Sequence, residues 1–297
     1  MARSGGTAHG FAPNAPDALL ARIRRVSPAL PRGQQKVVDF FLSHCDQAVF
    51  FTSTRVARAI SVSEATVVRT ARALGFSGYP AFRAAFQTYF VDRMSTVTRV
   101  RLTTAGARKE PDIIDEVLST DLRNLEATRA KLDQKSLSRA AELIAEAREV
   151  HVVGLRAAYS IAWLVHFSLT LISVNSHLIT LGLGEIPEHL DRVRTGDTVL
   201  GVTFGRYTRA TVELFRSCIE RGARGIALTD KPTSPLVEGA EVVVEADTRL
   251  SSFIDSTVAP MAIVNVLVTL VAARNRKRTL KALAEREENW RRQRIYM

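Results

Sequence analysis

Cysteine is scarce in this chain of 297 residues, which contains only Cys45 and Cys218. Two cysteines so far apart cannot build the multiply bridged framework of a small secreted domain, and neither lies in the spacing of a zinc-ligand pair. We therefore expect two reduced thiols in a cytoplasmic protein. Nucleophile-elbow and Walker-type motifs are missing as well, so the sequence predicts neither a cofactor nor a metal ion.

Long uninterrupted apolar runs are also missing. The N-terminal segment 1–16 has no apolar core of signal-peptide length, and we expect it to be a disordered lead. The segment 256–274 comes nearest to a bilayer span, but Pro260 and Asn265 interrupt it and basic residues follow it. A buried helix of a parallel-sheet protein is the better interpretation, and no membrane partner is expected.

Acidic residues are outnumbered, because the chain has 41 Lys and Arg against 30 Asp and Glu, a formal net charge of +11. The excess is concentrated in residues 1–100, which contain 13 basic and 5 acidic residues. A basic first third joined to a nearly neutral remainder indicates an N-terminal module that binds a polyanion such as nucleic acid.

Up to residue 94 the apolar residues recur at helical spacing, which predicts an all-α domain over 17–94. A short helix near residues 19–23 precedes predicted helices over 34–44, 52–60, 64–74 and 79–94. Residues 95–110 show little periodicity and are predicted to be a linker. A long helix or a pair of helices is expected to follow over 111–148.

From residue 150 short apolar runs alternate with helical patterns. This alternation predicts an α/β three-layer domain, assigned to 111–280, with a five-stranded parallel sheet of the flavodoxin-type, doubly wound kind. The predicted strands are 150–155, 176–182, 198–204, 224–230 and 240–247. Ligands of such sheets bind beyond the carboxyl ends of the strands, where residues 204–209 lie. The charged segment 281–297 is predicted to be a helix that is either solvated or packed in a dimer.

Within residues 52–74, two short helical patterns are joined by the turn Ser61-Val62-Ser63. Apolar residues on both helices can close against each other, and Ser63 can cap the second helix. This is the pattern of a helix-turn-helix, whose second helix enters the major groove. The residues predicted to face DNA are Ser63, Glu64, Ala65, Thr66, Arg69 and Arg72. The arginines can contact phosphate or guanine, and a plain helical hairpin with a solvated face is the alternative.

The stretch SVSEATVVRTARALGFSGYPAFRAAF, residues 61–86, resembles the DNA-binding domain of the RpiR/MurR-type bacterial transcription regulators. Those regulators carry a sugar isomerase (SIS) domain after the helix-turn-helix, and the resemblance covers roughly residues 20–280 in the same order. It implies an SIS-like effector-binding domain. Ser61 departs from the family pattern, because glycine often holds this turn position and serine tolerates a positive φ less well.

The resemblance also implies two effector loops, after the first and third strands. SIS domains bind phosphosugars there, usually with Gly-x-Gly-x-Ser and Ser-x-Ser-Gly-x-Thr. In this sequence Arg156 replaces the second glycine of the first loop, and Gly205-Arg206 replaces the central Ser-Gly of the second loop. A later run that includes Thr-Asp and Ser-Pro-Leu matches the family well, with Glu241 in place of an aspartate. The predicted effector residues are Gly154, Arg156, Ser160, Thr203, Gly205, Arg206 and Thr208.

If the first and third strands are neighbours, Arg156 and Arg206 project from adjacent strand ends, and two guanidinium groups there suit a phosphate or a carboxylate, so we expect a small anionic effector. The alternative is that both arginines pair with acids of the same chain or of a second subunit. A rival function is a sugar-phosphate isomerase with an accessory helical domain, which needs a general base. The candidates, none in a recognisable catalytic spacing, are Glu185, Glu188, His166, His177 and His189.

Taken together, these features predict a ligand-responsive transcription regulator rather than an enzyme. It is expected to bind a double-stranded DNA operator as a homodimer or homotetramer, because one recognition helix contacts only one half-site. A non-specific nucleoid-type DNA-binding protein is a third possibility.

Overall fold

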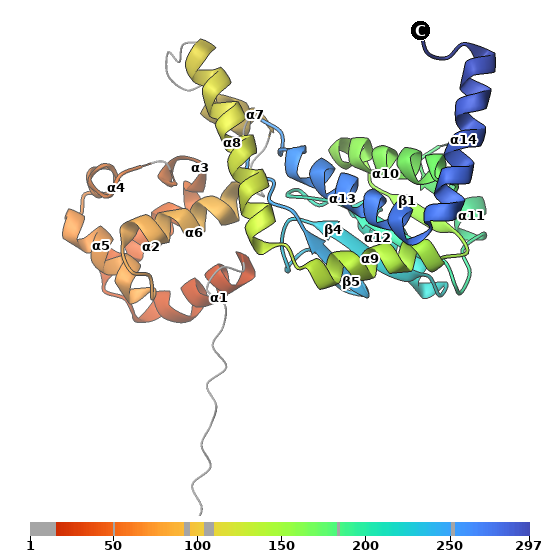
Figure 1. Cartoon of the computed structure of the whole chain (residues 1–297). Helices are drawn as coiled ribbons and strands as arrows, with labels where there is room; N and C mark the ends of the chain where they lie inside the picture. The colour runs from red at the N-terminus through yellow and green to blue at the C-terminus, as the bar shows by residue number, and fades with distance from the viewer. Residues whose placement is uncertain (1–15, 50, 92–95, 104–109, 183–184, 251–252) are drawn as a thin grey trace, which may run out of the picture. The chain divides into compact units, whose positions relative to one another are not determined.

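The computed structural model describes residues 16–49, 51–91, 96–103, 110–182, 185–250 and 253–297. The chain divides into two compact units, Met1–Thr98 and Arg99–Met297 (Figure 1). The predicted disordered lead lies outside the described residues except for Pro16, where the first helix begins.

The first unit is helical, as the sequence predicts. Its helices are α1 (Pro16–Val26), α2 (Arg32–Ser43), α3 (Cys45–Ala48), α4 (Ser53–Ala59), α5 (Glu64–Ala73) and α6 (Tyr79–Val91), with a 3-10 turn at Ser27–Ala29. Phe41 of α2 and Phe82 and Phe86 of α6 are fully buried, and their ring centroids lie 4.7 to 5.0 Å apart. These edge-to-face contacts hold α2 against α6 and form the centre of the core.

A further helix, α7 (Thr96–Thr103), lies at the junction of the two units, inside the segment predicted to be a linker. Its apolar residues Val97 and Val100 are exposed. Among the described side chains of this helix no apolar residue is buried, and its eight residues lack the repeated apolar spacing by which a helix is recognised in a sequence. The part of the predicted linker at 104–109 lies outside the described residues.

The second unit contains the predicted five-stranded sheet. Its strands are β1 (Val150–Val153), β2 (Ser176–Ile179), β3 (Thr198–Val202), β4 (Arg224–Thr229) and β5 (Val242–Glu245). They are all parallel in the order β2-β1-β3-β4-β5, which is the flavodoxin-type order. The strand order reverses between β1 and β3, so the loops that follow these two strands meet at the topological switch point where such sheets bind ligands.

Helices cover both faces of the sheet. One face packs on α9 (Gln134–Glu146), α10 (Tyr159–Leu171) and α13 (Val258–Arg274), and the other on α11 (Glu185–Leu190) and α12 (Arg209–Glu220). Successive side chains of a strand point to opposite faces of the sheet, so Leu200 belongs to the core on the first face and Val199 to the core on the second. The helices α8 (Glu110–Lys131) and α14 (Arg276–Gln293) complete this unit.

The apolar segment 256–274 forms α13, which packs against α8, α9 and α10 and buries Ile263, Val264 and Leu267. It is the buried helix that the sequence predicts. Among the described residues, no helix alone has the length and apolar composition of a membrane span, and the pair α13–α14 meets those criteria only jointly, across a bend of 105°. Both cysteines are buried and neither forms a disulfide bond, and burial raises the pKa of Cys218 to about 12.

Candidate functional site

The helices α4 and α5 pack against each other as a helix-turn-helix. Val56 and Ala57 of α4 and Val67 of α5 are buried in the core of the first unit, and Val62 in the turn is half-buried against it. Ser61 has a φ of 54°. It therefore takes the left-handed conformation that glycine adopts without strain, at the turn position where the sequence departs from the family pattern.

The start of α5 is held by hydrogen bonds of its own side chains. Ser63 caps the helix, because its Oγ accepts the N–H of Thr66 at 3.1 Å. The Glu64 carboxylate accepts from Ser53 Oγ at 2.6 Å and from Thr54 Oγ1 at 3.0 Å. These two bonds lower the pKa of Glu64 and tie α5 to the start of α4. Ser63 and Glu64, both predicted to face DNA, thus also brace the motif internally.

The exposed side of α5 carries the remaining predicted DNA contacts. Ala65, Arg69 and Arg72 are exposed, and Thr66 is half-buried. Arg55 of α4 is also exposed, and its guanidinium lies 4.0 Å from the ring centroid of Phe51. Arg55 is not among the residues predicted to face DNA, although the local excess of basic residues includes it. The helix-turn-helix therefore presents several cations for phosphate or base edges.

The first predicted effector loop follows β1, at the carboxyl edge of the sheet. A side chain at Gly154 would lie 2.9 Å from Ala162 Cβ and 3.1 Å from Val202 Cβ, so only glycine lets α10 and β3 approach β1 here. Arg156 is exposed and has a φ of 59°. The backbone thus keeps a glycine-like conformation where the family pattern has glycine. Ser160 is exposed, and its Oγ donates to a backbone carbonyl at 3.0 Å.

The second predicted loop follows β3 and leads into α12. Thr203 is buried, and its Oγ1 accepts the N–H of Thr208 at 3.4 Å. Gly205 has a φ of 53°, and its N–H donates to Asp230 Oδ2 at 3.4 Å. The Tyr207 hydroxyl donates to the other oxygen of Asp230 at 3.0 Å. Burial raises the pKa of Asp230, although the nearby cation and these donors oppose that shift.

A second carboxylate, that of Asp255, borders the same loop. A Cβ added to Gly205 would lie 2.9 Å from Asp255 Oδ2. Asp255 forms an ion pair of 3.3 Å with Arg99 of α7, whose side chain is only 4% exposed. Sequence reasoning missed this pair, because Arg99 and Asp255 are 156 residues apart and belong to no motif. Arg206 is exposed, so both predicted effector arginines lie at the carboxyl edge with accessible side chains.

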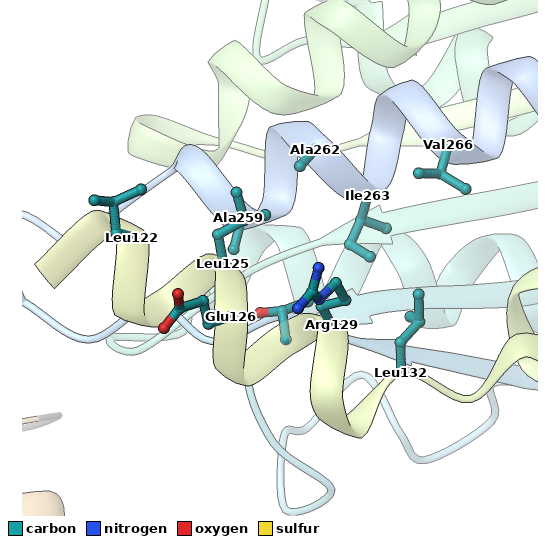
Figure 2. Close-up of a pocket in the computed structure, with 10 residues that line it drawn as sticks. Leu122, Leu125, Glu126, Arg129, Leu132, Ala259, Ala262, Ile263 and Val266 are labelled. Carbon is teal, nitrogen blue, oxygen red and sulfur yellow. The ribbon is translucent and has the colours of Figure 1, made fainter. Parts of the chain in front are cut away.

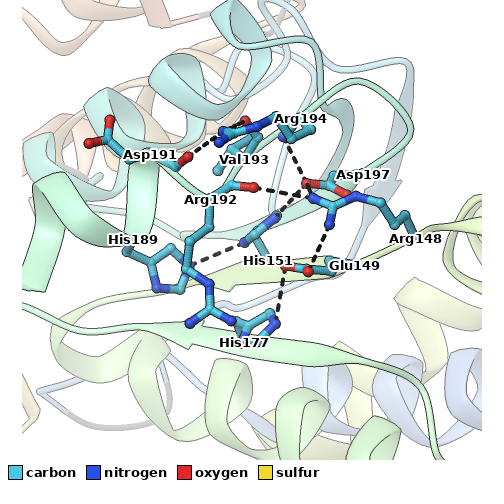
Figure 3. Close-up of polar contacts among 10 residues, drawn as sticks. All are labelled: Arg148, Glu149, His151, His177, His189, Asp191, Arg192, Val193, Arg194 and Asp197. Carbon is cyan, nitrogen blue, oxygen red and sulfur yellow. Dashed lines mark hydrogen bonds and ion pairs between the residues drawn. The ribbon is translucent and has the colours of Figure 1, made fainter.

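The three candidate histidines of the rival isomerase function do not gather at these loops. His177 lies on β2 and His189 at the end of α11, within a polar network at the amino ends of the strands (Figure 3). The Nδ1 of His166 lies 3.1 Å from Ser176 Oγ, at the start of β2. Glu188 is exposed, and the side chain of Glu185 lies outside the described part of the structure. Because the strands are parallel, their amino ends form the edge opposite to the effector loops.

A pocket of about 410 Å³ lies between α8 and α13 (Figure 2). Its lining is mainly apolar and consists of Leu122, Leu125, Glu126, Thr128, Arg129, Leu132, Ala259, Ala262, Ile263 and Val266. Its charged residues are Glu126 and Arg129, so a single guanidinium faces an acid of the same pocket. An anion site needs several cationic hydrogen-bond donors, which this lining does not supply.

The two units together define a DNA-binding protein built from a helix-turn-helix domain and a sugar isomerase-type domain. Residues 17–92 match the helix-turn-helix domain of the rpiR family, and residues 143–270 match the SIS domain. The chain belongs to the RpiR family of helix-turn-helix transcriptional regulators. The family expected from residues 61–86 is thereby confirmed.

Two relatives of known name are transcriptional regulators. The regulator HexR of Pseudomonas aeruginosa is 26% identical over 265 residues, which cover 86% of this chain and 90% of that protein. The regulator RpiR of Escherichia coli is 25% identical over 232 residues, or 75% of this chain and 74% of that protein.

Two solved structures share the fold. The sugar isomerase domain of an RpiR transcription factor from Sphaerobacter thermophilus has 31% sequence identity and a TM-score of 0.56, and covers 58% of this chain and 97% of that one. NanR of Vibrio vulnificus, solved in complex with ManNAc-6P, has 23% identity and a TM-score of 0.57 over 92% of this chain and 97% of that one.

Proposed function

We propose that this regulator binds operator DNA through α5 and adjusts that binding in response to a small acidic metabolite, a sugar phosphate or a carboxylate. The observation that carries the proposal is the pair Arg156 and Arg206, which are exposed at the ends of the neighbouring strands β1 and β3. Guanidinium groups bind phosphate and carboxylate oxygens in pairs, so two of them at one edge suit a small anion.

The start of α12 supports an anion at the same place. Thr208 precedes this helix, and its side chain does not cap the first turn, which contains no acidic residue. The first N–H groups of a helix and its dipole favour negative charge. An anion held by Arg206 would therefore also be stabilised by the amino end of α12. The complex of NanR with ManNAc-6P supports the sugar-phosphate alternative, because that relative shares the fold.

The regulator acts as a homodimer or homotetramer on a near-palindromic operator in the cytoplasm, since each α5 contacts one half-site. The effector shifts the equilibrium between arrangements of the DNA-binding domains. That shift is no larger than the difference in effector affinity between those arrangements. In the second loop, Gly205 donates to Asp230 and lies against Asp255. A bound effector displaces or rearranges these two carboxylates.

A thermal-shift series tests this function, with sugar phosphates and small carboxylates as probes, ManNAc-6P among them. A ligand at a hundred times its Kd stabilises the folded state by about 2.7 kcal/mol, which raises the melting temperature. Arg206→Ala should remove this response. The control is Arg216→Ala, which removes an exposed arginine of α12 that pairs with Glu238.

A parallel titration of fluorescent operator DNA, with and without the active probe, measures whether the effector alters DNA affinity. A probe that stabilises the protein equally in wild type and Arg206→Ala would place the anion elsewhere. Turnover of a sugar phosphate by the purified protein would instead favour the isomerase alternative.

A further inference from the structure

A cluster of three histidines and two carboxylates lies at the amino ends of the first three strands (Figure 3). Its members are Glu149 just before β1, His151 in β1, His177 in β2, His189 in α11 and Asp197 just before β3. The parallel register places His151 directly beside His177. The centroids of the three imidazole rings lie 5.3 to 6.0 Å apart. This cluster is separate from the effector loops, which lie at the carboxyl edge.

The geometry points to a site for a divalent transition-metal ion such as Zn²⁺, with Glu149, His151, Asp197 and His177 as its ligands. One donor atom each of Glu149, His151 and Asp197 lies within 4.8 Å of the others. The His177 Nε2 lies 3.2 Å from Glu149 Oε2, and the His151 Nε2 lies 3.0 Å from Asp197 Oδ2. Ligands bound tetrahedrally to Zn²⁺ at about 2.0–2.2 Å are separated by roughly 3.3–3.6 Å, close to the distance between His177 Nε2 and Glu149 Oε2.

Three buried atoms of this cluster lack a hydrogen-bond partner in the described part of the chain. They are Asp197 Oδ1, Glu149 Oε2 and His177 Nε2. The side chain of Asp197 is fully buried, and leaving a buried acceptor without a donor costs about 1–3 kcal/mol. A cation between these atoms would satisfy all three.

Arg148 is the cation that already contacts the two carboxylates. Its guanidinium donates to Glu149 Oε1 and to Asp197 Oδ2, at 2.8 Å each, and the backbone N–H of Arg194 also donates to Asp197 Oδ2. These donors use one oxygen of each carboxylate and leave Glu149 Oε2 and Asp197 Oδ1 for a metal ion. Arg148 thus orients both ligands from behind, as outer-shell partners of metal sites do.

A second histidine orients the ring of His151 for metal binding. The His151 Nδ1 lies 3.2 Å from His189 Nε2. His189 can accept a hydrogen bond there, which fixes the ring of His151 with its Nε2 toward the carboxylates. A donor set of imidazole and carboxylate suits Zn²⁺ and its neighbours in the first transition row.

The test uses the full-length chain without an affinity tag, treated with a chelator and dialysed. After incubation with Zn²⁺ and gel filtration, elemental analysis should give one zinc ion per chain, and the melting temperature should rise. Co²⁺ in place of Zn²⁺ should give the visible absorption of a protein-bound ion. His177→Gln and Glu149→Gln, two partly accessible ligands, should each weaken binding by at least about tenfold.

The matched control is His166→Gln, which removes a half-buried histidine of α10 from outside the cluster and should leave metal binding unchanged. Circular dichroism of each variant checks that it is folded. The inference is overturned if the wild-type chain retains no zinc, or if both ligand variants bind Zn²⁺ as tightly as the wild type. None of these readouts depends on effector or DNA binding.

Discussion

At the scale of single residues, two positions have a backbone conformation that their side chains disfavour. Ser61 in the helix-turn-helix and Arg156 in the first effector loop both have a positive φ. A non-glycine residue in the left-handed region costs about 1–3 kcal/mol when the surrounding structure holds it there. At both positions the family pattern has glycine, so the backbone keeps a glycine-like conformation although the residue differs.

Replacing Ser61 with glycine should therefore stabilise the first unit. We expect Ser61→Gly to raise the free energy of unfolding by up to about 1 kcal/mol, because glycine adopts this φ without strain. Urea denaturation measures the change. Ser77→Gly, at an exposed serine that lacks a positive φ, should give no gain. Equal effects of the two substitutions would show that Ser61 is not strained.

Glu241 gives the second prediction at this scale. Hydrogen bonds from Arg224, and then from Arg139, bring the pKa of this carboxyl to about 2 against an ordinary value of 4.5. Because the folded-state pKa is depressed, the stabilisation is present above pH 4.5 and is lost as the pH falls toward 2. Glu241→Gln should thus destabilise the protein at pH 7, by less than about 1 kcal/mol since the group is partly exposed.

Denaturant unfolding of the wild type and Glu241→Gln at several pH values checks this expectation. The difference between the two proteins should shrink steadily below pH 4.5. Glu238→Gln, at a more exposed acid with a single arginine partner, is the control and should show little pH-dependent difference. A difference independent of pH would mean that Glu241 acts through packing and not through its charge.

At the scale of elements, the proposed recognition helix α5 depends on its first turn. Ser63→Ala should lower the free energy of unfolding by about 1 kcal/mol, because the N–H of Thr66 loses its side-chain acceptor. Thermal or urea denaturation measures this loss. Ser63→Asp keeps a capping oxygen and should retain most of the stability. If the alanine and aspartate variants were equally destabilised, capping would not be the role of Ser63.

The sequence was sufficient to predict most elements, and the exceptions have physical causes. All five strands are found inside the predicted ranges, because buried parallel strands are short apolar runs that stand out between helical patterns. The helix α7 escaped prediction because its eight residues lack a repeated helical spacing of apolar side chains. The cap by Ser63 was predicted because capping is local, within three residues.

The sites were harder to predict, because they depend on contacts distant in the sequence. The carboxylates beside Gly205 belong to Asp230 and Asp255, and only the fold brings them there. Likewise His151 and Asp197 are 46 residues apart, and the pairing of β1 with β3 joins them. A motif search finds ligands at fixed spacing along one segment, and these groups have no such spacing.

At the scale of the whole molecule, the basic N-terminal unit should make DNA binding steeply dependent on salt. The logarithm of the association constant should fall linearly with the logarithm of the salt concentration, with a slope set by the number of neutralised phosphates. Arg69→Ala should weaken binding and, if this arginine contacts a phosphate, reduce that slope by about 1 without unfolding the protein.

Fluorescence anisotropy with labelled operator DNA at several salt concentrations gives both quantities, and circular dichroism monitors folding. Arg25→Ala is the control, because Arg25 is exposed on α1, outside the helix-turn-helix. Unchanged affinity and slope for Arg69→Ala would show that the exposed side of α5 does not contact DNA. Equal affinity for unrelated duplexes would instead favour the non-specific binding protein.

The glycine-like backbone at Arg156 has an evolutionary consequence. Every arginine codon is one base change from a glycine codon, and at this position the exchange requires no rearrangement of the loop. A lineage could therefore gain or lose this guanidinium in a single mutational step, while Gly154 keeps the strand and helix in place. Paralogues with the same fold could thus differ in the charge of this loop, each through a change that selection can test immediately.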